Sequence, residues 1–127
     1  MALTLGSIGE EMDLLIRQGA TFGPHVVTMT NPDGSPVDLT GVLLRGSIRK
    51  EPRALVKYDL TFVITNPTGG VYKMFMLDTE TKVLTAGPSL SHVDSRYVWD
   101  SEMVDTLGNV IPLYYGKVNV QREITRE

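Results

Sequence analysis

The chain has 127 residues, of which 42% are hydrophobic and 21% are charged, a balance typical of one globular domain with a single core. Its net charge of −3 argues against binding by neutralisation of nucleic-acid phosphates, and no apolar run approaches the roughly 20 residues of a membrane-spanning helix. The absence of cysteine excludes disulfides and thiolate metal sites. We therefore expect neither a nucleic-acid nor a membrane partner, and residues 1–8 lack the features of a secretory signal.

Residues 1–12 are predicted to form an extended arm that precedes a single domain spanning residues 13–127. The aliphatic residues of the arm, Leu3, Leu5 and Ile8, are separated by glycines, a spacing that suits neither a long helix nor a well-paired strand. Two interpretations are open at this point. The segment is either a frayed terminus or an arm that docks on a neighbouring subunit.

From residue 13 onward, apolar runs alternate with turn residues, which predicts successive β-strands. Gly23 and Pro24 interrupt the first run, and because proline has no N–H to donate, they mark an edge position or a bulge. Residues 31–36, with the sequence NPDGSP, carry the clearest turn signal. The predicted strands comprise residues 13–18 continuing into 21–30, then residues 42–50, 55–65 and 71–77.

Two of these strands carry an informative pattern of side chains. In residues 42–50, apolar and polar side chains alternate, which predicts one face in the core and one in water. In residues 71–77 both faces are largely apolar. This pattern indicates a central strand or a strand that a partner covers.

Residues 78–85 are the one segment predicted to be helical. Either Asp78 or Thr79 is expected to cap it, Glu80 falls in its first turn, and Gly87 follows its end. The helix is short, so most of the chain is expected to be sheet.

Residues 96–123 are predicted to form a long hairpin that closes the fold. Tyr97, Trp99 and Met103 recur at even spacing with two acidic residues at alternate positions, as in a half-buried strand. The Leu-Gly-Asn sequence at 107–109 suits a tight turn, and period-two alternation resumes after it. Two strands alone are marginal in water, so the hairpin must belong to a larger sheet.

The residue spacings point to no catalytic or metal-binding site. His25 and His92 do not share a metal-ligand spacing, and the serine and aspartate near His92 lack a nucleophile-positioning turn. Asp100 and Glu102 share a strand face, where a solvated edge explains them more simply than paired catalytic carboxylates or a calcium site. We predict no enzymatic activity, no cofactor and no metal.

The candidate interface residues are basic, aromatic and aliphatic. On strand spacing, Arg45 and Arg49 project from one face, which is either the solvated face of an edge strand or a surface for an acidic partner. Tyr114 and Tyr115 place one ring on each face of a strand, and an exposed Tyr115 suits an interface. The full set of candidates is Leu3, Leu5, Ile8, Arg45, Arg49 and Tyr115.

Several sequence segments together resemble a family of small structural proteins. The segments are QGATF (18–22), DGSPVDLTG (33–41), IRK (48–50), the Thr-rich helix (78–85), RYVWDSEMVD (96–105), GNV (108–110) and YGKVNVQREITR (115–126). In this order they resemble the small β-sandwich proteins of tailed bacteriophages, in the style of the N-terminal domain of the upper baseplate protein. The resemblance implies an all-β, immunoglobulin-like antiparallel sandwich of about seven or eight strands with one short helix.

The resemblance also implies a role without catalytic residues. The expected protein is a virion component, assembled in the host cytoplasm, that acts as an adaptor or joint of the tail or baseplate. Its partners would be other virion proteins and copies of itself in a symmetric assembly. The alternatives are a head or neck decoration or attachment protein, and a carbohydrate-binding module that uses exposed aromatic rings.

Overall fold

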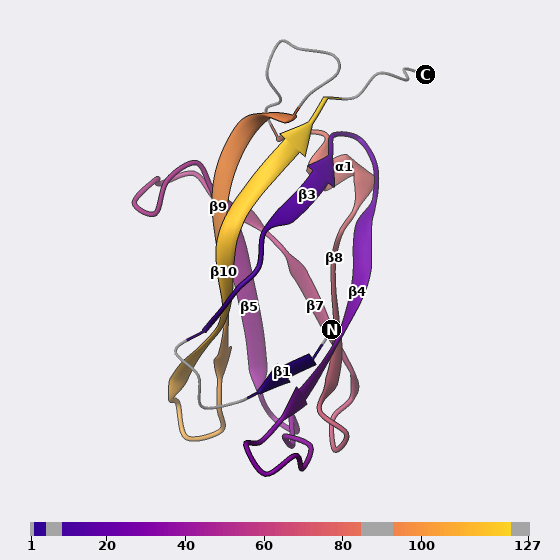
Figure 1. Ribbon diagram of the computed structural model, residues 1–127, viewed down its shortest axis with the longest axis vertical. Helices are drawn as coiled ribbons and strands as arrows, with labels where there is room; N and C mark the ends of the chain where they lie inside the picture. The colour runs from indigo at the N-terminus through magenta and orange to yellow at the C-terminus, as the bar shows by residue number, and fades with distance from the viewer. Residues whose placement is uncertain (1, 5–8, 85–92, 123–127) are drawn as a thin grey trace.

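Two β-sheets pack face to face around one core, and the described part of the chain has one short helix, which lies at one end (Figure 1). This computed structural model describes residues 2–4, 9–84 and 93–122. The predicted all-β sandwich is confirmed. Within those residues, no helix has the length and apolar character needed to cross a bilayer.

The smaller sheet has four strands in the order β1-β4-β8-β7. As predicted, β8 is a central strand, and it pairs antiparallel with β4 on one side and β7 on the other. Its inward-facing side chains, Tyr72, Met74 and Met76, are buried. The strands of this sheet are β1 (Ala2–Thr4), β4 (Phe22–Thr30), β7 (Thr61–Asn66) and β8 (Val71–Met76).

The larger sheet has six strands, ordered β2-β10-β9-β5-β6, with β3 also paired to β10. Together with β4, β8 and β7 opposite, this order is that of a variable-type immunoglobulin sandwich. In contrast to the expected all-antiparallel pairing, β1, β2 and β3 each pair parallel with their neighbour. The strands are β2 (Glu10–Glu11), β3 (Leu14–Arg17), β5 (Leu43–Arg49), β6 (Tyr58–Asp59), β9 (Val93–Val104) and β10 (Val110–Gln121).

The first predicted strand and its continuation are two strands in different sheets. Leu14 and Ile16 of β3 face the core from the larger sheet, whereas Phe22 of β4 faces it from the smaller sheet. A turn at residues 18–21 carries the chain between the sheets, which the local apolar pattern does not reveal. The predicted bulge at Gly23-Pro24 is confirmed by the shift in strand register between Phe22 and His25.

The strand predicted over residues 55–65 also divides between the sheets. Leu55 and Val56 are exposed in a loop, and strand pairing begins only at Tyr58. The chain then changes sheet at Leu60, which is buried and donates its N–H to the Gly46 carbonyl at 3.0 Å. The predicted start at residue 55 is therefore wrong: Leu55 and Val56 are apolar but lie in the loop, and the first strand of this region begins at Tyr58.

The helix α1 (Asp78–Thr81) is shorter than predicted and has a different cap. Leu77 occupies the N-cap position, and its N–H donates to the Glu80 carboxylate at 2.8 Å. Thr81 is buried, and its hydroxyl donates to the Ala20 carbonyl at 2.8 Å, which fixes the helix to the β3–β4 turn. The predicted stop at Gly87 lies outside the described residues.

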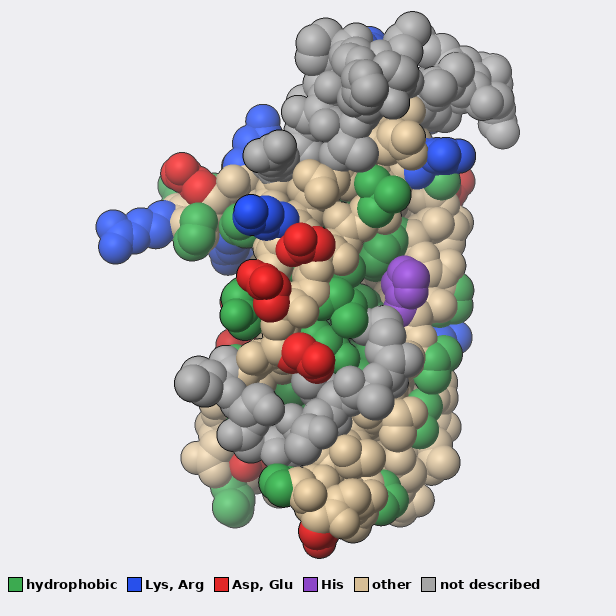
Figure 2. Space-filling view, viewed as in Figure 1, with side chains coloured by type: hydrophobic (Ala, Val, Ile, Leu, Met, Phe, Trp, Pro, Cys, Tyr) green, Lys and Arg blue, Asp and Glu red, His purple; other side chains and the backbone are tan. Residues whose placement is uncertain are grey.

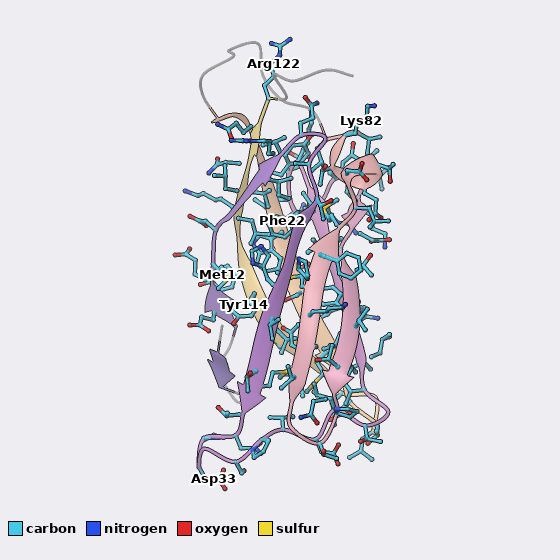
Figure 3. The ribbon with its side chains drawn as sticks, turned by 90° about the vertical axis from the view of Figure 1, so that its right-hand side faces the viewer. Met12, Phe22, Asp33, Lys82, Tyr114 and Arg122 are labelled. Atoms are coloured by element: carbon cyan, nitrogen blue, oxygen red, sulfur yellow. The ribbon has the colours of Figure 1, made fainter. Side chains whose placement is uncertain are left out.

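The predicted closing hairpin is confirmed as β9 and β10, the two longest strands described. Tyr97, Trp99 and Met103 face the core, and the Trp99 ring stacks on Tyr114 with centroids 6.1 Å apart. Figure 3 looks onto the smaller sheet and labels Phe22 and Tyr114, whose side chains are buried. This core holds the larger sheet in place and leaves its opposite face open to solvent.

The described parts of the N-terminal arm pair with strands of the same chain. Ala2–Thr4 runs parallel to the end of β4, and Glu10–Glu11 runs parallel to β10. The Met12 carbonyl then accepts a hydrogen bond from Trp99 Nε1 at 2.7 Å. Docking of the arm on a neighbouring subunit stays a prediction, and its residues Leu5 and Ile8 lie outside the described residues.

Candidate interaction surface

The solvent face of the larger sheet, here called the outer face, carries a row of polar side chains across five strands. The strand register pairs Ser47 with both Asp59 and Asp100, pairs Asp100 with Tyr115, and pairs Tyr115 with Glu11. Because side chains alternate along a strand, the neighbouring residues point into the core. The row therefore brings together residues from β6, β5, β9, β10 and β2.

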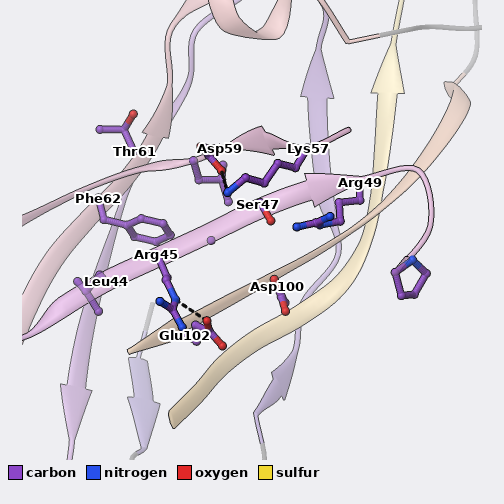
Figure 4. A pocket seen from close by; sticks show the side chains of 13 residues that line it. Leu44, Arg45, Ser47, Arg49, Lys57, Asp59, Thr61, Phe62, Asp100 and Glu102 are labelled. Carbon is purple, nitrogen blue, oxygen red and sulfur yellow. Dashed lines mark hydrogen bonds and ion pairs between the residues drawn. The ribbon is translucent and has the colours of Figure 1, made fainter. Parts of the chain in front are cut away.

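Basic side chains flank this row and balance its acids. Arg45 forms an ion pair with Glu102 across β5 and β9, and Lys57 lies 3.3 Å from Asp59 (Figure 4). All four side chains are substantially exposed, so each pair contributes only about 0–1 kcal/mol to stability. Charges placed this way contribute more to the orientation of a partner than to the fold.

Asp100 lies at the centre of the row, and its pKa is raised. Partial burial raises its pKa above the ordinary aspartate value, and the nearby negative charge of Glu102 raises it further. Arg49 and Arg45 act in the opposite direction but do not cancel the effect. The charged form of Asp100 is therefore disfavoured here, and a cationic group from a partner would relieve that cost.

The β5–β6 loop, residues 50–57, forms a wall beside the row. The Arg49 guanidinium donates to the Ala54 carbonyl, which fixes the loop against the sheet. Pro52 borders two grooves, one of about 710 Å³ toward β6 and β7 and one of about 420 Å³ toward β10. Both grooves include Ser47 and Asp100, so the row runs through both, and the outer face is hollowed on each side of these two residues.

The structure brings together three of the six predicted interface residues. Arg45, Arg49 and Tyr115 all lie on the outer face, where Tyr115 is 49% exposed and Tyr114 is buried, as the alternation predicts. Leu3 lies in β1 of the other sheet. Leu5 and Ile8 are outside the described residues.

Sequence reasoning missed Glu11 and Lys117 as members of the outer face. Glu11 reaches it through the parallel pairing of β2 with β10, a contact between residues about a hundred positions apart. Lys117 lies on the correct face of a correctly predicted strand, and its alternation with Tyr115 was a usable signal. No pattern in the residues around Glu11 indicates that its side chain lies on the outer face.

The remaining candidates for chemistry do not converge in the structure. The described residues contain no group of three or more histidine, aspartate or glutamate side chains placed to hold a metal. His25 lies in β4 of the smaller sheet with its ring 4.7 Å from that of Phe22, and His92 is outside the described residues.

No protein-family model matches the sequence. No curated protein matches it significantly either. Among solved structures, the fold is similar to an internalin-like protein of Listeria monocytogenes, with a TM-score of 0.44 and 14% sequence identity. The match covers 89% of this chain and 28% of that protein, and at this level of similarity it carries no argument about function.

Proposed function

We propose that this protein is a non-enzymatic binding module that holds other polypeptides through the outer face of its larger sheet. One observation carries the proposal. Arg45, Arg49 and Tyr115, each marked by the sequence as an interface residue, lie on one open face with Asp100 and Glu102 between them. Tyrosine and arginine are enriched in protein–protein interfaces and among the residues that contribute most of their binding energy.

The setting we propose is the virion of a tailed bacteriophage, with the module acting as an adaptor or joint of the tail or baseplate. The support is the sequence resemblance across residues 18–126, together with the two-layer sandwich that this resemblance implies. The partners are other virion proteins and further copies of the chain. Head or neck attachment is an alternative within the same class.

The test is site-specific photo-crosslinking in intact particles. A photoreactive phenylalanine analogue at position 115 is expected to capture a neighbouring virion protein, identified by mass spectrometry. The control position is Thr68, which is exposed in the turn between β7 and β8 of the smaller sheet. Absence of the protein from purified particles would refute the virion proposal, and equal capture from both positions would refute the assignment to the outer face.

The arm contributes a second part of this proposal through Leu3, Leu5 and Ile8. Burial of each aliphatic side chain against a neighbour would contribute about 1.5–3 kcal/mol. Deletion of residues 1–10 should leave a folded domain that enters particles poorly. Normal incorporation of the deleted protein would show that the arm has no docking role.

A carbohydrate-binding module remains the alternative of a different class. Such a module needs an exposed aromatic platform, and in the described residues Tyr115 is the one large aromatic side chain that is strongly exposed. Trp99 is 3% exposed, and its Nε1 already donates to Met12. Binding on a glycan array that Tyr115→Ala abolishes would favour this alternative.

A further inference from the structure

The β5–β6 loop, residues 50–57 and here called the basic loop, carries an apolar side chain that is almost fully exposed to solvent. Leu55 is 97% exposed and its neighbour Val56 is 64% exposed. Residues 50–57 also hold three basic side chains and one acidic side chain. Figure 1 shows the loop projecting to the left, away from both sheets.

The cations of the basic loop differ in how far they are already engaged. Lys57 pairs with Asp59, and Lys50 lies 5.9 Å from the centre of the Tyr97 ring. Within the described residues, Arg53 makes neither a hydrogen bond nor an ion pair, and it is exposed. The loop therefore combines an exposed apolar residue, Leu55, with a positive charge two residues away, on Arg53, that has no acidic partner among the described residues.

An apolar notch with one acidic residue in its lining, Asp13, lies elsewhere on the same chain, where β3 and β4 separate between the sheets. It has a volume of about 270 Å³ and is lined by Met12, Asp13, Leu14, Leu15, Phe22, His25 and Met74. An apolar cavity of about 150 Å³ already accepts a benzene molecule, so this notch has room for one aliphatic side chain. Leu15 at its rim is 59% exposed.

The approach to this notch carries a net negative charge. Residues 10–17 contain three acidic side chains and one basic side chain, and Glu10, Glu11 and Asp13 are all exposed. Figure 2 shows acidic side chains gathered over the segment that leads into β3, beside a strip of hydrophobic side chains. The notch thus has the charge opposite to that of the basic loop and the same apolar character at its centre.

We propose that the basic loop of one copy binds the notch of a second copy, with Leu55 inserted and Arg53 facing Glu11 and Asp13. The loop projects to the left, whereas the acidic side chains near the notch lie on the face towards the viewer (Figures 1 and 2), so after one contact forms, one copy still has a free notch and the other a free loop. Such a head-to-tail contact generates a closed ring or an open filament rather than a two-fold dimer. The inference rests on the proposed function, because it names the surfaces through which copies of the chain assemble.

The test uses the purified full-length chain and two matched variants. Sedimentation velocity should show concentration-dependent association of the wild-type chain, weakened by salt because exposed charges contribute. Leu55→Asp and Leu15→Asp should each weaken association about tenfold to a hundredfold, as expected for a leucine that loses its burial. Both residues are exposed, so neither change disturbs the core, and Leu107→Asp at an 86% exposed turn position is the control.

Mixing the variants distinguishes this contact from other modes of association. The Leu55→Asp chain keeps an intact notch and the Leu15→Asp chain an intact loop, so an equimolar mixture should form a dimer and stop there. A second pair tests the charges: Arg53→Glu and Glu11→Arg should each weaken assembly alone and restore it when mixed. A mixture that stays monomeric would overturn the head-to-tail contact.

Other outcomes separate this inference from the proposed function. A wild-type chain that stays monomeric up to millimolar concentration, yet is present in particles, would refute self-assembly and leave the binding module standing. If Leu55→Asp then reduces incorporation into particles, the loop binds a different protein and the second copy is excluded as its occupant. Head-to-tail oligomers of a protein absent from virions would support the contact and refute the virion setting.

Discussion

The closing hairpin and the N-terminal segment, here residues 10–17 with β2 and β3, both belong to the larger sheet, yet they are held there in opposite ways. The strands β9 and β10 are antiparallel neighbours joined by a short turn, in which Asp105 accepts hydrogen bonds from Leu107 and Asn109. The strands β2 and β3 are short and pair parallel with β10, about a hundred residues away in sequence. A hairpin of neighbouring strands is specified by the side-chain pattern of its own residues, whereas pairing between strands that are distant in sequence depends on a few specific contacts.

Three of those contacts fix the N-terminal segment to the hairpin. Trp99 Nε1 donates to the Met12 carbonyl, and the Lys117 N–H donates to the Asp13 carboxylate at 2.9 Å. At Gly116, a Cβ atom would lie 2.2 Å from the Met12 carbonyl oxygen, so only glycine allows the two backbones to approach this closely. Loss of any one contact should affect the segment more than the hairpin.

Trp99 supports both regions, so its removal should have the largest effect. Trp99→Ala should lower the free energy of unfolding by about 3–5 kcal/mol through the cavity it leaves. Trp99→Phe keeps most of the ring but removes the donor to Met12, and should cost about 1–2 kcal/mol. Urea denaturation measures both, and equal losses for the two variants would show that the hydrogen bond, not packing, dominates.

Gly116→Ala should destabilise the N-terminal segment more than the closing hairpin. The added methyl group must displace the Met12 backbone, at a cost of about 1–3 kcal/mol. We expect faster amide exchange at Met12 and Gln18, whose N–H groups bond to Tyr115 and Gln121, while amides shared by β9 and β10 keep their protection. Uniform loss of protection in both regions would contradict the separation.

The same distinction explains which parts of the fold were predictable. The hairpin, the buried positions of Tyr97, Trp99 and Met103, and the central place of β8 follow from alternation along one strand. The two changes of sheet, at residues 18–21 and at Leu60, do not. At each, apolar residues continue on both sides while the sheet they cover changes, which only the pairing with distant strands determines.

The candidate interaction surface was also predictable only in part. That Arg45 and Arg49 share a face, and that Tyr115 is exposed beside a buried Tyr114, follows from spacing alone. The assembly of these residues with Glu11 and the basic loop required the parallel pairing of β2 and the fold of residues 50–57 over the sheet. Leu55 illustrates the limit, because an apolar residue expected in a strand lies in solvent.

Gly108 tests how much the hairpin depends on its turn. Its φ of +87° lies in the left-handed region, and a Cβ atom there would meet no other atom within 4 Å. Gly108→Ala should therefore lower stability by about 1–2 kcal/mol through backbone strain alone. In thermal unfolding, Gly34→Ala, at φ +89° with equally open space, is the matched control in the β4–β5 connection. A much smaller loss at 108 than at 34 would mean that the hairpin forms without its turn.

The smallest predicted effect concerns Asp100, which the hairpin holds in its charged row on the outer face. Because its folded-state pKa is raised, protonated Asp100 favours the folded state at low pH, and this contribution is lost as the pH rises through the raised value. Asp100→Asn should therefore stabilise the protein at neutral pH, by up to about 1 kcal/mol after solvent screening. The gain should diminish as the pH falls below about 4, where aspartate becomes increasingly protonated in both states. Urea titrations at pH 7 and pH 3.5 measure this, with Asp59→Asn at the exposed end of the row as the control. A destabilised Asp100→Asn variant at pH 7 would show that Arg45 and Arg49 outweigh the burial and the charge of Glu102.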